Sequence, residues 1–134
     1  MIVVNDGESM EIKDGESAIV LDGGHLVVNI GGRAKVHSGG HAEVCNAGYV
    51  HVREGGTANA HYGGHVEVHA GGEAIVNDGG MATIQAGGHA KVKEGGTAYV
   101  LEGGCATVYP GGTATGPGEI NYVELPTENI MPSV

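Results

Sequence analysis

Large side chains are nearly absent from this chain of 134 residues, which contains no Phe and no Trp and has an aromatic content of 4%. A globular core of ordinary size is built from such residues, and their absence argues against a conventional enzyme fold. Long apolar runs are absent too. No stretch approaches the roughly 20 residues of a membrane-spanning helix, so we expect no membrane insertion.

Basic residues are also scarce: six Lys and Arg stand against 16 Asp and Glu, which gives a formal charge of -10. This charge repels phosphate backbones and anionic lipid surfaces. We therefore expect no nucleic-acid partner.

Cysteine is limited to Cys45 and Cys105, 60 positions apart in the chain, and we expect both to be free thiols of a reducing compartment. The opening MIVVNDG lacks the basic and apolar regions of a secretory signal. The expectation is a chain that is cytoplasmic as made, with assembly into a surface or virion structure as a further step. From the first Met and the atypical tail we expect a complete unit, with a stretch of a longer chain as the alternative.

Glycine, in contrast, is abundant and periodic. Of the 27 glycines, 25 fall in two adjacent columns that recur with every octad of the chain. Ala47 interrupts the first column, and Glu8 and Glu16 interrupt the second. A repeat of this length without long connections winds as a solenoid, in which each unit contacts only its neighbours.

Within each octad, counted from the first Gly, apolar residues occupy positions four and six and polar residues occupy positions three, five and seven. Position four is mostly Ala, and position six is Val or Ile in all octads from Gly7 onward except those of Ala60 and Gly116. Alternation with a period of two is typical of a half-buried strand. The residue before the Gly pair and the pair itself form the turn, and both glycines are expected to supply positive backbone angles.

The sequence thus predicts an all-β fold, a β-solenoid of octapeptide repeats. Two parallel sheets with 16 residues per coil are favoured, because the larger position-four residues pair at a spacing of 16, Met10 with Leu26 and Val50 with Val66. A three-sided coil of three octads, about 24 residues, is the alternative. The repeat spans residues 1–118, and residues 119–134 are expected to form a divergent strand followed by a capping tail that covers the end of the array.

Residues two octads apart lie side by side if alternate octads form opposite sheets. This places Cys45 beside His61 as a candidate metal-binding pair, with His51 beside Glu67 in the opposite sheet. Neighbouring outward residues on one strand are about 7 Å apart, so we expect at most two ligands per site. Neither a catalytic site nor a bound cofactor is expected, since no Ser lies next to a base and a repetitive surface offers no visible pocket.

The outward residues also include an apolar group near the N-terminus, Val3, Ile19 and Leu21, which we predict to contact a partner. The repeat begins in register at Ile2, so the first strand lacks an evident cap.

The repeat, as in GGHAKVKEGGTAYVLEGGCATVYPGGTATG, resembles the short Gly-Gly repeats of AIDA-like autotransporter adhesin passengers over residues 7–116. The resemblance implies adhesion or self-association without catalysis. This chain differs in its strict period of eight and in having neither a signal peptide nor a translocating barrel. Phage tails and other appendages use similar solenoids, so an appendage component is a related prediction by analogy.

The favoured hypothesis is accordingly a non-enzymatic rigid spacer that forms a homo-oligomer or docks to a protein partner. The alternative is a binding module whose outward His, Tyr and Glu rows recognise a carbohydrate or a metal.

Overall fold

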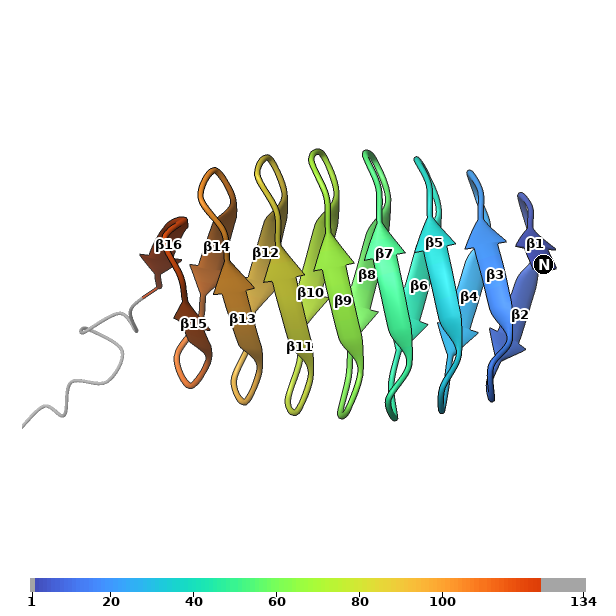
Figure 1. Cartoon of the computed structure of the whole chain (residues 1–134), viewed down its shortest axis with the longest axis horizontal. Coiled ribbons are helices and arrows are strands. Elements are labelled where there is room, and N and C mark those ends of the chain that lie inside the picture. Colours follow the sequence, from blue (N-terminus) through green and yellow to red (C-terminus); the bar gives the residue numbers. More distant parts are fainter. Residues whose placement is uncertain (1, 124–134) are drawn as a thin grey trace, which may run out of the picture.

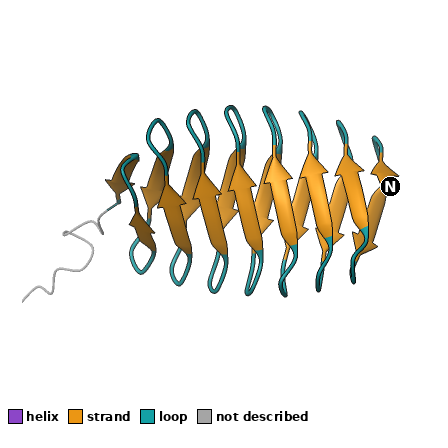
Figure 2. Ribbon diagram, viewed as in Figure 1, coloured by secondary structure: helices purple, strands orange, loops and turns teal. Residues whose placement is uncertain are grey.

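A computed structural model describes residues 2–123 and shows a rod of stacked coils, each built from two strands that run in opposite directions (Figure 1). The strands form two eight-stranded parallel sheets, and alternate strands along the chain belong to the same sheet. Turns project along the two long edges of the rod (Figure 2). The predicted two-sheet solenoid with two octads per coil is confirmed, and the three-sided alternative is wrong.

The first sheet contains β1 (Ile2–Val4), β3 (Ser17–Val20), β5 (Arg33–Val36), β7 (Tyr49–Val52), β9 (His65–Val68), β11 (Met81–Ile84), β13 (Thr97–Val100) and β15 (Thr113–Thr115). The second contains β2 (Ser9–Ile12), β4 (His25–Val28), β6 (His41–Val44), β8 (Thr57–Ala60), β10 (Glu73–Val76), β12 (His89–Val92), β14 (Cys105–Val108) and β16 (Glu119–Tyr122). No helix that could span a membrane occurs within residues 2–123.

Neighbouring strands pair positions that are two octads apart along almost the whole rod. Met10 pairs with Leu26 and Val50 with Val66, as the sequence pattern predicts. The last coil is an exception, because Cys105 pairs with Glu119 at a spacing of 14. The segment around Gly116 and Gly118 thus makes this coil shorter than the others.

The core is a thin double row of small side chains between the sheets. Nearly all Ala and Val residues at positions four and six are less than 5% exposed, and no polar residue within the described part of the chain is buried. Such a core depends on close packing, because its largest fully buried side chains are Ile12, Leu26 and Ile84 and the rest are Val and Ala.

The two glycine columns have different structural roles. Glycines of the first column have positive φ values, 79° at Gly7 for example, and Ala47 in the same column has a φ of 73°. The second column does not share this backbone conformation. A Cβ added at Gly56 would lie 2.8 Å from the carbonyl oxygen of Val36 in the preceding coil. The prediction that both glycines supply positive angles is therefore wrong for the second, which is Gly because the coils approach closely.

Glu8 and Glu16 interrupt the second column at the end of the rod where no described coil lies below them. Their carboxylates fold back over their own turns, where Glu8 Oε1 accepts a hydrogen bond from the Asn5 amide at 2.7 Å and Glu16 Oε1 accepts one from the Lys13 amide at 2.9 Å. A side chain is thus tolerated in this column where no carbonyl of a preceding coil opposes it.

The two ends of the rod depart from the regular pattern. Met10 occupies an inward position, yet it is 43% exposed, whereas its neighbour Leu26 is fully buried. Met10 is exposed because no described strand packs on that side of it. At the other end β16 adds a strand to the second sheet and ends at Tyr122. The predicted capping tail, from residue 124 onward, lies outside the described residues.

Candidate functional site

Outward side chains make two kinds of contact between coils. Residues two octads apart lie side by side, as predicted for Tyr49 with His65 and His51 with Glu67. In a second set of contacts the two residues are two octads plus two positions apart, because a side chain also touches its diagonal neighbour in the next strand of the same sheet. Diagonal hydrogen bonds and ion pairs join Glu11 to Asn29, His25 to Glu43, His41 to Asn59, Glu43 to His61, Tyr49 to Glu67, His51 to His69, Glu67 to Gln85 and His89 to Thr107.

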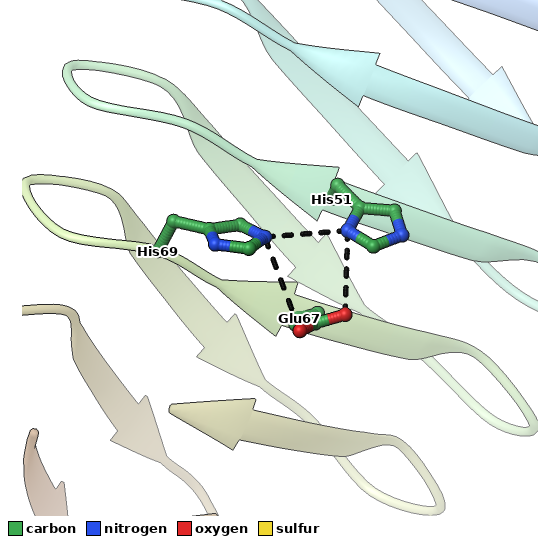
Figure 3. Close-up of side chains that lie close together, drawn as sticks. All are labelled: His51, Glu67 and His69. Atoms are coloured by element: carbon green, nitrogen blue, oxygen red, sulfur yellow. Dashed lines mark hydrogen bonds and ion pairs between the residues drawn. The ribbon is translucent and has the colours of Figure 1, made fainter. Parts of the chain in front are cut away.

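Diagonal contacts bring three potential ligands together in the middle of the first sheet. Nδ1 of His51 lies 3.3 Å from Nε2 of His69 and 3.3 Å from Oε1 of Glu67, and Nε2 of His69 lies 3.9 Å from Oε2 of Glu67 (Figure 3). In the described part of the chain this is the one group of three His, Cys, Asp or Glu residues whose ligand atoms converge. The expected limit of two ligands is too low, because His69 follows the end of β9 and faces His51 diagonally.

Each carboxylate oxygen of Glu67 accepts a hydrogen bond from a neighbouring side chain. The Tyr49 hydroxyl donates a hydrogen bond to Oε1, and Nε2 of Gln85 donates one to Oε2, each at 2.7 Å. The hydrogen bond from Tyr49 is the main reason why the pKa of Glu67 lies below its usual value, and the nearby His51 and His69 lower it further. Glu67 is therefore a fixed, ionised acceptor at neutral pH.

The imidazoles around Glu67 pack on one another and on Tyr49. The rings of Tyr49 and His65 stack at 4.8 Å with an interplanar angle of 8°, and those of His51 and His69 at 5.5 Å with 19°. Partial burial lowers the pKa values of His51 and His65, an effect that the charge of Glu67 opposes. Both rings are neutral at pH 7 as a result, and a neutral ring nitrogen has a lone pair available.

Tyr49 itself provides a prediction at alkaline pH. Burial, followed by the hydrogen bond to Glu67, raises its pKa to about 12 from the usual 10.0. The folded state retains this proton longer than the unfolded state does. Its stabilising effect is thus complete below pH 10 and is lost as the pH rises through 12. A phenolate absorbance titration should show one late step among the five tyrosines.

Tyr49→Phe should remove that late step and reduce the loss of stability between pH 10 and 12. Tyr62→Phe is the matched control, because Tyr62 is 75% exposed. Persistence of the late step in Tyr49→Phe would contradict the assignment.

The predicted metal pair, Cys45 and His61, lies on the opposite sheet, directly after β6 and β8. The Cys45 thiol donates a hydrogen bond to Oδ1 of Asn29 at 2.8 Å, and burial together with Glu11 and Glu43 raises its pKa. His61 Nε2 lies 3.5 Å from Oε1 of Glu43. Nε2 of His61 is buried and has no hydrogen-bond partner, and metal binding by this pair stays a prediction. Both cysteines are free, as expected.

The predicted contact residues lie together at the N-terminal end of the first sheet. Val3 pairs with Ile19, and Leu21 directly follows β3. Val3 is 46% exposed and Leu21 36%. The spacing of two octads is sufficient to place this group, whereas finding the His51, Glu67 and His69 group requires the longer diagonal spacing.

No protein-family model matches this chain, and no curated protein matches it. Among solved structures, the chain is similar to a TibA fragment described as hyper-glycosylated through catalysis by TibC. The identity is 19%, the match covers 91% of this chain and 80% of that chain, and the TM-score is 0.18. At this TM-score the similarity supports no conclusion about the fold or the role of the chain.

Proposed function

We propose that this chain is a non-enzymatic structural module, a rigid β-solenoid that associates with a second copy of itself through its N-terminal end. This end consists of β1 and β2 with the side chains of Ile2, Val3 and Met10. The observation that carries the proposal is Met10, a side chain of the inward row that is 43% exposed. The apolar group of Val3, Ile19 and Leu21 continues the same surface onto the first sheet. A role at a cell surface or in an appendage, which the resemblance of the repeat implies, belongs to the same proposal.

A second copy of the chain is favoured as the partner because both sheets end at this end of the rod, in β1 and β2. A partner must offer two strand edges at the separation of the two sheets, and another solenoid end does so. Glu8 and Glu16 disfavour the stacking of a further coil in the regular register, because that coil would meet their side chains. The equivalent Gly24 already lies so close to the coil below that an added Cβ would be 2.6 Å from the Val4 carbonyl oxygen. A head-to-head dimer related by a two-fold axis does not require the regular stacking register. It uses the N-terminal ends of both copies, so no further copy can add there.

Charge should modulate this association. Six acidic side chains and a single Lys occur between Ile2 and Asp22, so two N-terminal ends repel one another. Salt screens this repulsion, with a Debye length of about 8 Å near physiological ionic strength. We expect the dimer to strengthen as sodium chloride is raised.

The test is sedimentation equilibrium over a concentration series, in which the wild-type mass should reach twice 13.4 kDa. Met10→Lys should weaken the dimer at least tenfold, because it places a charge at an apolar contact. Met81→Lys is the matched control, since Met81 is 47% exposed in the middle of the rod. Ile19→Lys with Leu21→Lys tests the adjoining surface.

Three outcomes would overturn the proposal. A monomer at all concentrations and salt conditions excludes self-association as the role. An equal effect of Met81→Lys excludes the N-terminal end as the interface. Open-ended growth excludes the closed head-to-head arrangement.

A further inference from the structure

We propose that His51, Glu67 and His69 bind one divalent transition-metal ion through Nδ1, a carboxylate oxygen and Nε2, respectively. The group joins the middle strand β7 to β9 and the residue after it (Figure 3). Two imidazoles and one carboxylate are a ligand set that suits Zn²⁺ and its neighbours in the first transition row.

The spacing of the three ligand atoms matches what one ion requires. Tetrahedral Zn²⁺ with bonds of about 2.0–2.1 Å separates its ligand atoms by roughly 3.4 Å. Nδ1 of His51 lies 3.3 Å from Nε2 of His69 and 3.3 Å from Oε1 of Glu67, and Nε2 of His69 lies 3.9 Å from the other carboxylate oxygen, Oε2. One ligand atom from each residue lies within 4.8 Å of the other two, so small shifts of the side chains place all three around an ion.

The ligands are held in position before any ion binds. Glu67 is fixed by Tyr49 and Gln85, and partners of this kind orient a ligating carboxylate in metal sites. The His51 ring packs between the rings of Tyr49, at 4.9 Å, and His69. All three ligands lie on or next to strands of one continuous sheet, so little conformational freedom is lost on binding.

Solvent reaches one side of the group, where the side chains of His51, Glu67 and His69 are 34%, 20% and 33% exposed. Three protein ligands leave the remaining coordination position open on that side. A water molecule or a group from a partner can occupy it.

Two nearby cationic side chains disfavour the binding of the metal ion because they repel it. Lys35 pairs with His51 in the neighbouring strand, and Arg53 follows β7. Repulsion of this kind weakens binding by a few-fold per unit charge at surface separations. Lys35→Gln is therefore expected to strengthen zinc binding about threefold, in the opposite direction to loss of a ligand.

The second sheet provides a matched control with the same residue types. Glu43 lies 3.7 Å from Nε2 of His25 and 3.5 Å from Nε2 of His61. These histidines belong to coils two steps apart, a separation of roughly 9.6 Å at the usual strand spacing. Within residues 2–123 they do not belong to a converging group of three ligand atoms.

The experiment is a titration of the full chain with Zn²⁺ against a chromophoric chelator, with the mass in solution followed in parallel. We expect one ion per chain for the wild type. Affinity should fall at least tenfold in His51→Ala, in His69→Ala and in Glu67→Gln. His25→Ala with Glu43→Gln should bind as the wild type does. Far-UV circular dichroism establishes that each variant is folded.

Histidine ring nitrogen spectra provide a second readout. Zinc should place the ring proton of His51 on Nε2 and that of His69 on Nδ1, and it should leave the ring signals of His25 unchanged. Binding that survives all three ligand replacements, or that falls equally in the control pair, would overturn the site. So would unchanged ring signals on saturation with zinc.

Discussion

Gly64→Ala is expected to lower the free energy of unfolding by about 3 kcal/mol, although it adds a single methyl group. Gly64 belongs to the second glycine column. An added Cβ would collide with the carbonyl oxygen of Val44 and lie 2.6 Å from its carbonyl carbon. That oxygen accepts the hydrogen bond from the His61 amide at 2.8 Å, so the backbone cannot move away without weakening the contact between β6 and the next coil. The thermal midpoint should fall by roughly 10 °C.

Gly15→Ala is the matched control from the first column. Gly15 has a φ of 81° and no neighbour within 4 Å of an added Cβ, so the substitution carries only the cost of a left-handed conformation, about 1 kcal/mol. Ala47, at a φ of 73°, already shows that alanine is accommodated in that column. Urea unfolding of both variants measures the difference. Equal losses would mean that backbone conformation, rather than close approach of coils, accounts for both columns.

Ala60→Val is expected to destabilise the protein by about 2 kcal/mol, even though Val or Ile occupies that position of almost every other octad. Because the two strands of a coil run in opposite directions, we expect position six of one strand to lie opposite position four of the strands before and after it. Ala60 should then face Val50 and Val66, where most octads have Ala, and all three residues are fully buried. On this arrangement the usual pairing of a large with a small residue is reversed at Ala60, and two extra methyl groups should crowd Val50 and Val66.

The partner substitution tests this explanation directly. Val66→Ala alone leaves a cavity and should cost about 1–3 kcal/mol, whereas combining it with Ala60→Val restores the volume. Urea unfolding of the two single variants and the double variant should show a favourable coupling of about 1–2 kcal/mol. Additive losses would show that Ala60 and Val66 do not share the same space.

Both predictions concern how tightly the coils pack, and the same packing bears on the two proposals. A stiff stack fixes the positions of His51, Glu67 and His69 before an ion binds. It also causes both sheets to end together at β1 and β2. Each surface feature thus depends on the spacing between coils rather than on a loop or a pocket.

The sequence by itself determined the fold and the order of residues along each row. A period of eight with alternating apolar residues predicts strands that bury positions four and six, and the pairing of Val50 with Val66 predicts the coil of two octads. These inferences succeed because a repeat imposes the same local geometry on every coil. The position of Val3 beside Ile19 follows from the same rule.

Only the tertiary structure decided why the second glycine is required, where Met10 stands and which side chains converge. A Gly at the close approach to a carbonyl looks the same in sequence as a Gly with positive φ, since both roles favour glycine. Met10 continues the inward row, yet its exposure depends on what packs beyond β2. The convergence of His51 with His69 depends on side chains that reach the diagonal neighbour, a spacing that is not a multiple of the octad.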